Sequence, residues 1–308
     1  MKITLITRAT ALIFALFAAQ SYALQLSFTQ VTPGVYAYIG ETAGRTYENE
    51  AMNANTGFIV TKAGVVVVDS GSTYQAAKAI HQEIKKVTQQ PVKYVINTGG
   101  QDHRWLGNGY FKEQGAQIIA HAKAKADMQD RAATLLAGLK TELKEKLDGT
   151  IAVYPDRLCE QKETLQLGGE EIQLLFFHGG HTPGDAVVWL PKSRTLFSGD
   201  HIYVNRLLGI LPISNSKDWL ASFEAIEKLK PKTIIPGHGK VCDLHKAQQQ
   251  TGNYLKLLRS HMRKAIDANK DLQTAINTLD QSAYKHLDIY ELLKGGNASR
   301  VYLEMETE

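Results

Sequence analysis

The chain has 308 residues, of which 21% are charged, and a formal net charge of +4 at pH 7. This length suits one large α/β domain with a proper core, or two small domains. No linker rich in Pro, Gly or Ser and no repeat at a fixed period divides the sequence. No run of Lys and Arg interleaved with aromatic residues is present, so the composition gives no support for nucleic acid as a partner.

Residues 1–23 have the pattern of a secretory signal peptide. Lys2 and Arg8 supply a basic start, an apolar stretch over 11–19 follows, and small residues precede a plausible cleavage point after Ala23. The alternative is an uncleaved anchor helix, but the apolar stretch is short for a membrane span. We therefore expect a periplasmic or secreted protein with no stable membrane anchor after cleavage.

The elements expected along the chain alternate between strands and helices. In chain order, they are strands at 57–60 and 65–68, a helix over 72–88, a strand at 92–96, a short helix at 110–114, a strand at 116–121, a helix over 122–147 interrupted near Gly138, strand pairs within 163–190, an amphipathic helix at 217–229, helices at 245–269, 271–279 and 283–293, and a short strand or helix at 300–304. This mixed order predicts sheets flanked by helices, in one domain with a helical C-terminal extension.

Four short apolar runs each end in a glycine-containing turn that carries histidine or aspartate. These turns span Asn97 to His103, His178 to Gly184, Ser198 to His201 and Pro236 to Gly239. Runs rich in Val, Ile and Phe predict buried strands. If the strand ends converge on one sheet edge, they place imidazoles and carboxylates where an open metal site can form. A metal-dependent hydrolase is therefore the leading interpretation.

The motifs of these turns resemble, in order and spacing, those of the metallo-β-lactamase superfamily. The matching segments are Gln101-Asp102-His103, Gly180-His181-Thr182-Pro183-Gly184, Ser198-Gly199-Asp200 and Pro236-Gly237-His238-Gly239, and strands that end in Val68-Asp69-Ser70-Gly71 fit the same family. The resemblance covers residues 55–243 and implies a four-layer αββα sandwich, of mixed α+β or α/β class, over 24–245. Residues 246–308 then form a helical extension packed on the same domain. The export signal and the ending Asn297 to Glu304 look most like periplasmic zinc metallohydrolases of the SoxH-like and quinoprotein-relay group.

The first turn departs from the family's pattern, which reads His-any-His-any-Asp-His. With Asp102 and His103 held in register, Thr98 and Gly100 stand where the first two histidines belong. Anchored instead on the preceding Asn-Thr pair, the motif begins at Gly99 and requires a one-residue deletion. Neither register recovers a histidine.

This departure bears on the number of metals that the resemblance implies. In the family's two-metal site, one metal takes the two missing histidines and the equivalent of His181. The other metal takes the equivalents of Asp102, His103 and His238, and the equivalent of Asp200 bridges both. The first metal would keep only His181 and a share of Asp200, which are too few ligands to hold zinc firmly. The resemblance thus implies one Zn2+ per chain, as in the mono-zinc subclass of metallo-β-lactamases.

An open zinc site lowers the pKa of its bound water toward about 7, which gives a hydroxide for attack on an ester, amide, lactone or thioester of a small-molecule substrate. Asp102 is then a ligand that also holds or deprotonates the water, and His181 is a general base or a substrate-binding group. Asp200 as a turn cap and His181 as a structural residue are the alternatives. Asp69 fits either a carboxylate that steers a ligand histidine or a strand-end turn former, and Gln101 fits either a donor into the vacated position or an exposed residue.

Other functions and pairings stay open from the sequence. A β-lactamase is one subset of the hydrolase interpretation, because this fold hosts many hydrolases. The loss of two ligands motivates a non-catalytic binding protein that keeps the old pocket. Cys159 and Cys242 are the only cysteines, and they allow either a disulfide or two unpaired thiols.

Overall fold

A seven-stranded and a five-stranded sheet form the centre of the protein in the computed structural model, which describes residues 24–308. The expected signal peptide and its cleavage after Ala23 lie outside the described residues. Within residues 24–308, no helix has the length and apolar character needed to cross a bilayer.

The two sheets differ in how their strands are connected. The first sheet holds its strands in chain order: β1 (Phe28–Thr32), β2 (Val35–Tyr38), β3 (Thr56–Thr61), β4 (Gly64–Val68), β5 (Val92–Ile96), β6 (Gln117–His121) and β7 (Arg157–Cys159). The second sheet has the order β12 (Thr233–Ile235), β11 (Thr195–Phe197), β10 (Ala186–Leu190), β9 (Glu170–Phe176) and β8 (Lys162–Leu167). Strands β4 to β7 are parallel to one another, as are β11 and β12, and the other neighbours are antiparallel.

The sheets pack face to face because successive residues of each strand point to opposite faces. In β4, Val66 and Val68 join the core between the sheets together with Phe197, whereas Val65 and Val67 join the core under the helices. All five residues of β4 are buried, as expected for a strand that is covered on both faces.

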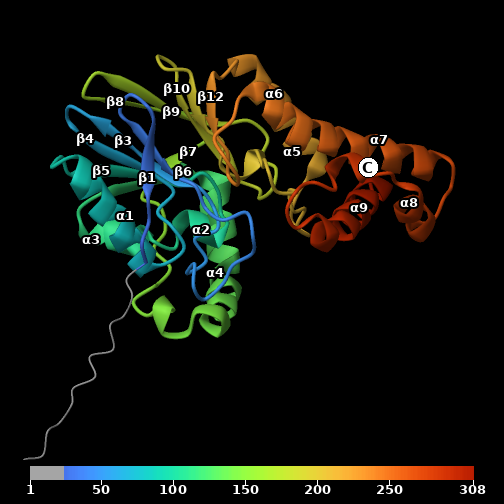
Figure 1. Cartoon of the computed structure of the whole chain (residues 1–308), viewed down its shortest axis with the longest axis horizontal. Helices are drawn as coiled ribbons and strands as arrows, with labels where there is room; N and C mark the ends of the chain where they lie inside the picture. Colours follow the sequence, from blue (N-terminus) through green and yellow to red (C-terminus); the bar gives the residue numbers. More distant parts are fainter. Residues whose placement is uncertain (1–23) are drawn as a thin grey trace, which may run out of the picture.

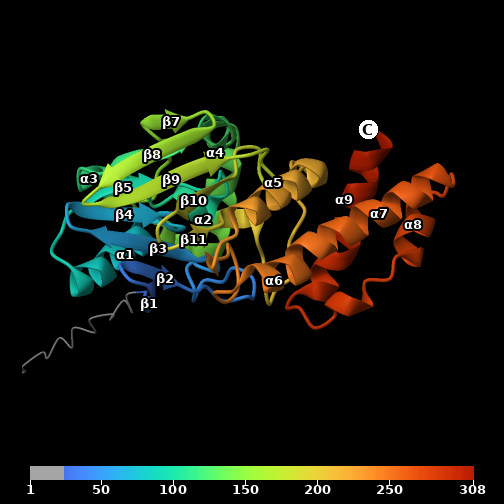
Figure 2. The same ribbon diagram turned by 90° about the horizontal axis from the view of Figure 1, so that it is seen from above.

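Helices cover the outer face of each sheet (Figures 1 and 2). Helices α1 (Tyr74–Val87) and α3 (Asn108–Glu113) pack on the first sheet, and α5 (Ser216–Leu229) and α6 (Leu244–Ala247) pack on the second. The one-turn helix α2 (Asp102–Trp105) and the long helix α4 (Ala122–Leu143) share a further buried cluster beside the first sheet. These layers form the αββα sandwich that the resemblance to the metallo-β-lactamase superfamily implies, so the fold prediction is confirmed.

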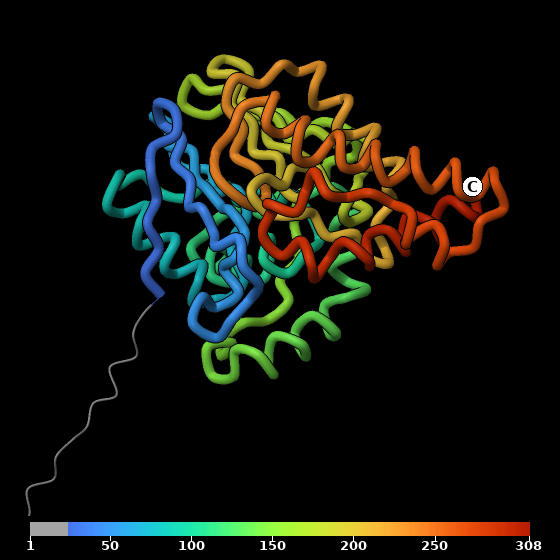
Figure 3. The backbone as a smooth tube through the Cα atoms, turned by 45° about the vertical axis from the view of Figure 1, so that its right-hand side comes forward, coloured from blue at the N-terminus to red at the C-terminus, as the bar shows by residue number. Residues whose placement is uncertain are grey.

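The C-terminal helices α7 (Asn253–Asp267), α8 (Leu272–Thr278) and α9 (Tyr290–Glu306) extend from one edge of the sandwich (Figure 3). Their core is completed by residues of the sandwich, namely Tyr203, Leu207, Leu208, Ile210 and Trp219. The loop that follows Asp200 is therefore packed against the extension.

Two local expectations differ from the structure, and one open alternative is resolved. Gly138 does not interrupt α4, because a single glycine in an open helical position costs only about 1 kcal/mol. The last helix begins at Tyr290, after a 3-10 turn at Ser282–Tyr284, and it includes the segment 300–304. Of the two states left open for Cys159 and Cys242, the structure has the free thiols and no disulfide between them.

Asn55, directly before β3 of the first sheet, is hydrogen-bonded to the turn after β12 of the second sheet. Its side-chain amide donates to the carbonyl oxygens of Pro236 (2.8 Å) and Gly239 (2.7 Å) and accepts from the amide of Gly40 (2.9 Å). Because these buried partners would lose their hydrogen bonds, Asn55→Ala is expected to lower the free energy of unfolding by about 2–4 kcal/mol in urea denaturation. Asn277→Ala, on the exposed face of α8, is the control and should change it by less than about 0.5 kcal/mol. Equal effects of the two substitutions would contradict the role given to Asn55.

Candidate metal centre

The loops after β4, β5, β11 and β12 bring the candidate residues together. Asp69 follows β4, and α2 begins a few residues after β5. Asp200 lies in the 3-10 turn Gly199–His201 after β11, and His238 lies in the turn after β12. The predicted convergence of strand ends on one site is therefore present.

His103, Asp200 and His238 form a buried group whose ligand atoms all lie within 4.8 Å of one another. The Nε2 atom of His103 is 3.4 Å from Asp200 Oδ2, and the Nε2 atom of His238 is 3.4 Å from Asp200 Oδ1. These separations are long for a charge-assisted hydrogen bond of about 2.7–2.9 Å. They match the spacing of about 3.4 Å between two ligands of one tetrahedral zinc ion at about 2.1 Å from each.

The other ring nitrogen of each imidazole agrees with a cation in the middle of this group. His238 Nδ1 is 2.9 Å from the carbonyl oxygen of Asn53, to which it donates, so its Nε2 carries a lone pair that faces a carboxylate. His103 Nδ1 is 3.4 Å from Asp102 Oδ1, an arrangement that likewise turns Nε2 toward Asp200. Ligand histidines in metal sites commonly hold a carbonyl or carboxylate at the outer nitrogen in this way. The donor set therefore fits a divalent cation.

A buried arginine lies beneath the group. Arg104 donates through Nη2 to Asp200 Oδ1 (2.6 Å) and through Nε to Asp200 Oδ2 (3.2 Å). Its Nη1 donates to Asp69 Oδ2 (3.0 Å), and Asp69 in turn accepts from the amide and hydroxyl of Thr98. Burial alone would raise the pKa of Asp200, but the charge of Arg104 holds it well below its usual range. Asp200 is therefore an anion, as a metal ligand must be.

Asp102 lies beside the group and not within it. Its Oδ1 accepts from Arg45 Nη2 (2.5 Å), on the loop between β2 and β3. Burial raises the pKa of Asp102 and the charge of Arg45 lowers it, with a net result of about 2. Its Oδ2 is buried and has no hydrogen-bond partner among residues 24–308. The proposed ligation by Asp102 stays a prediction, and as placed its carboxylate faces Arg45 and the outer nitrogen of His103.

His181 also lies outside the group of three. Its Nδ1 is 2.9 Å from the carbonyl oxygen of Gly209, to which it donates, so Nε2 is the acceptor. Burial lowers the pKa of His181 to about 4. The imidazole is thus neutral at neutral pH, which suits a general base or a metal ligand, and both roles stay predictions.

The placement of α2 favours a third register of the first motif, different from the two that the sequence suggested. His103, not Asp102, faces Asp200, and Arg104 is the next residue on the one-turn helix. A motif that begins at Gly99 without any deletion puts His103 at the aspartate position and Arg104 at the last histidine position. The structure favours this register, in which Gly99 and Gln101 replace the first two histidines.

The space around Gly99 and the neighbouring Gly100 is filled. A side chain at Gly99 would clash with Asp185, whose carboxylate accepts from the amide of Thr182 (2.6 Å). Burial, followed by the charge of Asp200, raises the pKa of Asp185 to about 8. A side chain at Gly100 would clash with Asp127, which is paired with Arg131.

Three further residues complete the site, and the sequence analysis does not predict them. Arg104 is one of them. The signal that could have revealed it is a charged residue placed between the motif histidine His103 and the apolar pair Trp105-Leu106. Tyr203 donates to Asp200 Oδ1 (3.0 Å) and stacks on the His238 ring at 4.7 Å. Arg206 Nη1 lies 3.3 Å from His238 Nδ1. The last two follow Asp200 on an irregular loop and carry no local signal.

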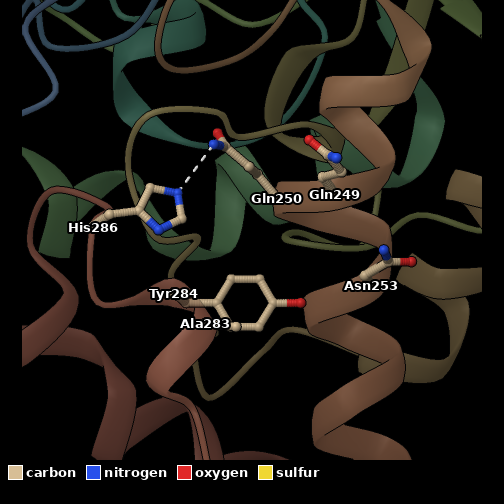
Figure 4. Close-up of a pocket in the computed structure, with 6 residues that line it drawn as sticks. All are labelled: Gln249, Gln250, Asn253, Ala283, Tyr284 and His286. Carbon is tan, nitrogen blue, oxygen red and sulfur yellow. Dashed lines mark hydrogen bonds between the residues drawn. The ribbon is translucent and has the colours of Figure 1, made fainter.

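A separate pocket of about 300 Å³ lies between the start of α7 and the turn before α9 (Figure 4). It is lined by Gln249, Gln250, Asn253, Ala283, Tyr284 and His286. None of these residues belongs to the metal group. Gln250 accepts from the amide of Asn205 (2.7 Å), so the pocket borders the loop that carries Tyr203 and Arg206.

Comparisons with known proteins agree with this geometry. The family model of the metallo-beta-lactamase superfamily matches residues 50–238. The metallo-beta-lactamase IND-1 of Chryseobacterium indologenes is 29% identical over 66% of this chain and 77% of its own length. A metallo-beta-lactamase type 2 of Elizabethkingia meningoseptica is 27% identical over 80% of this chain and 90% of its own. A solved metallo-beta-lactamase from Pontibacter korlensis has the same fold, with a TM-score of 0.61, 23% identity, and coverage of 75% of this chain and 99% of that one.

The chain therefore belongs to the metallo-β-lactamase superfamily. Its homologues in this superfamily are metal-dependent hydrolases, which confirms the family and the class of enzyme predicted from the sequence. The family match ends at residue 238, so the helices α7 to α9 lie beyond it.

Removal of the buried guanidinium provides a test of this network. Arg104→Met leaves Asp69 and Asp200 unpaired, and it should lower the free energy of unfolding at neutral pH by about 3–5 kcal/mol. In the native protein the lowered pKa of Asp200 stabilises the fold above about pH 4, and this contribution is lost as the pH falls through the lower folded value. In the variant, buried unpaired carboxylates are relieved by protonation, so the gap between the two proteins should narrow on acidification.

The free energy of unfolding of both proteins is measured by urea denaturation from neutral pH to below about pH 4. The control is Lys112→Met, which removes an exposed ion pair with Asp156 and should change stability by less than about 1 kcal/mol. A loss for Arg104→Met as small as that of the control, or one independent of pH, would contradict the network.

Proposed function

We propose that the protein is a periplasmic hydrolase that holds one zinc ion at His103, Asp200 and His238 and cleaves an ester, amide, lactone or thioester of a small molecule. The observation that carries this proposal is the buried group of two imidazoles and one carboxylate at 3.4 Å separations, with the outer nitrogens of both rings already engaged. Three protein ligands with an open fourth position are typical of catalytic zinc sites.

When bound, zinc supplies a Lewis acid and lowers the pKa of a coordinated water toward neutrality. The protein's own residues orient the Asp200 carboxylate and balance its charge. Arg104 fixes both oxygens of Asp200, and Tyr203 holds the same carboxylate from the other side. His181, neutral and with a free Nε2, can accept a proton from the attacking water or hold the substrate.

The choice of one metal ion is supported by what fills the first metal's former position. Asp185 occupies the space next to Gly99, where the side chain of the first histidine would have to pass. Asp185 is itself held by Thr182. The periplasmic location rests on the signal-like segment at 1–23 alone. A β-lactam is one candidate substrate within the proposed class, which the names of the relatives suggest.

Metal analysis of the purified mature protein tests the proposal. About one zinc per chain is expected by mass spectrometry, and His103→Ala and His238→Ala should each lose it because three ligands are the minimum for a firm site. His178→Ala is the matched control, since its side chain is exposed and should leave the zinc content unchanged. Two zinc ions per chain would refute the mononuclear site. No zinc, even after zinc is supplied, would refute the hydrolase and favour a binding protein.

Restoring the two missing histidines tests the single-metal claim separately. The double variant Gly99→His, Gln101→His should still bind about one zinc, because the new imidazole at 99 meets the buried Asp185. The same variant should unfold at lower urea concentration than the native chain, owing to the overpacked site. Gln101→His alone is the control and should fold normally. A second zinc in the double variant would show that the position is empty and available.

A further inference from the structure

The C-terminal helix α9 is hydrogen-bonded to the loop that follows Asp200. Asn297, fully buried on α9, donates through Nδ2 to the carbonyl oxygen of Leu208 (2.8 Å) and accepts through Oδ1 from the amide of Ile210 (2.8 Å). Arg300, one turn later, donates to the carbonyl oxygen of Ile210 (2.5 Å). One side chain therefore holds the backbone on both sides of Gly209.

Gly209 is the residue that orients His181. Its carbonyl oxygen accepts from His181 Nδ1 at 2.9 Å, which fixes the protonated nitrogen and leaves Nε2 as the acceptor. The position of this carbonyl follows from its two neighbours, because Leu208 and Ile210 are held by Asn297. Two sets of hydrogen bonds thus connect α9 to the imidazole: those from Asn297 to the peptide groups beside Gly209, and the one from His181 to the Gly209 carbonyl.

The buried side-chain amide of Asn297 is explained by its hydrogen bonds to the loop around Gly209. An amide buried in an apolar cluster costs free energy unless its donors and acceptor are all paired. Asn297 satisfies this condition with Leu208, Ile210 and the hydroxyl of Tyr254, which lies 3.2 Å from its Nδ2. An apolar residue would fill the same space in the core of the extension, but it would not fix the peptide groups around Gly209.

We propose that the C-terminal extension is a positioning device for the site: Asn297, supported by Arg300, holds the carbonyl of Gly209 so that His181 keeps its proton on Nδ1 and presents Nε2 to the substrate. This role goes beyond the proposed function, because it assigns a purpose to a segment outside the family match. It concerns the tautomer of His181, so it holds whether or not the substrate class is right.

The test reads that tautomer directly in the full mature chain. Two-bond proton–nitrogen NMR spectra of isotopically labelled histidine distinguish protonation at Nδ1 from protonation at Nε2, and the His181 signal is identified by its loss in His181→Gln. In the native chain the Nδ1-protonated form should dominate. Asn297→Ala should lower its ratio to the Nε2-protonated form roughly fivefold, the effect of losing about one net hydrogen bond.

Met305→Ala is the matched control, because Met305 is buried in the same cluster from the same helix and makes no contact with residues 208–210 through a polar group. It should lower stability without a change in the His181 tautomer. Arg300→Ala is the second variant, at a half-buried position that the fold should tolerate, and it should shift the tautomer in the same direction as Asn297→Ala. The proposal is overturned if Asn297→Ala and Arg300→Ala leave the tautomer unchanged, or if Met305→Ala shifts it equally. Unaltered zinc content in these variants separates this result from any failure of the metal site.

Discussion

The buried ion pair between Arg104 and Asp200 is the interaction on which the site depends. Asp200 has both oxygens bonded to one guanidinium, and the same guanidinium reaches Asp69 on the neighbouring strand end. A buried pair of this kind is costly to break, because removing one partner leaves an unpaired charge. The pair therefore fixes the direction of the Asp200 carboxylate before any ligand arrives, and the two histidines are placed around that fixed anion.

Charge balance explains why a cation is expected above this pair. Three carboxylates, those of Asp69, Asp102 and Asp200, are paired with only two arginines, Arg45 and Arg104. The imidazole of His238 is neutral because burial and then the charge of Arg206 hold its pKa well below the usual range. The lone pair of His238 Nε2, which faces Asp200, is then unfavourable next to a carboxylate unless a positive charge lies between them. A divalent ion removes this repulsion and gives the site a net positive charge, which favours an electron-rich carbonyl substrate.

Much of the fold and part of the site follow from the sequence. The valine run of β4 and the glycine turns after the strands predicted buried strands and a common site at their ends, where His103, Asp200 and His238 lie. The sandwich itself was implied by the resemblance of these turns to the metallo-β-lactamase superfamily. The register of α2 did not follow, because successive residues of a helix point about 100° apart and a shift of one residue exchanges His103 for Asp102. Both registers derived from the motif spacing kept Asp102 as the motif aspartate, and the structure favours neither. The link from Asn297 to Leu208 spans 89 residues, and no local pattern reports a contact at that separation.

Anomalous diffraction at the zinc absorption edge, from crystals of the mature protein grown with zinc, tests the central claim most directly. The account predicts one peak per chain, about 2.1 Å from Nε2 of His103, Nε2 of His238 and an oxygen of Asp200. A peak bound by Asp102 in place of His103, a second peak beside His181, or no peak between these residues would contradict it.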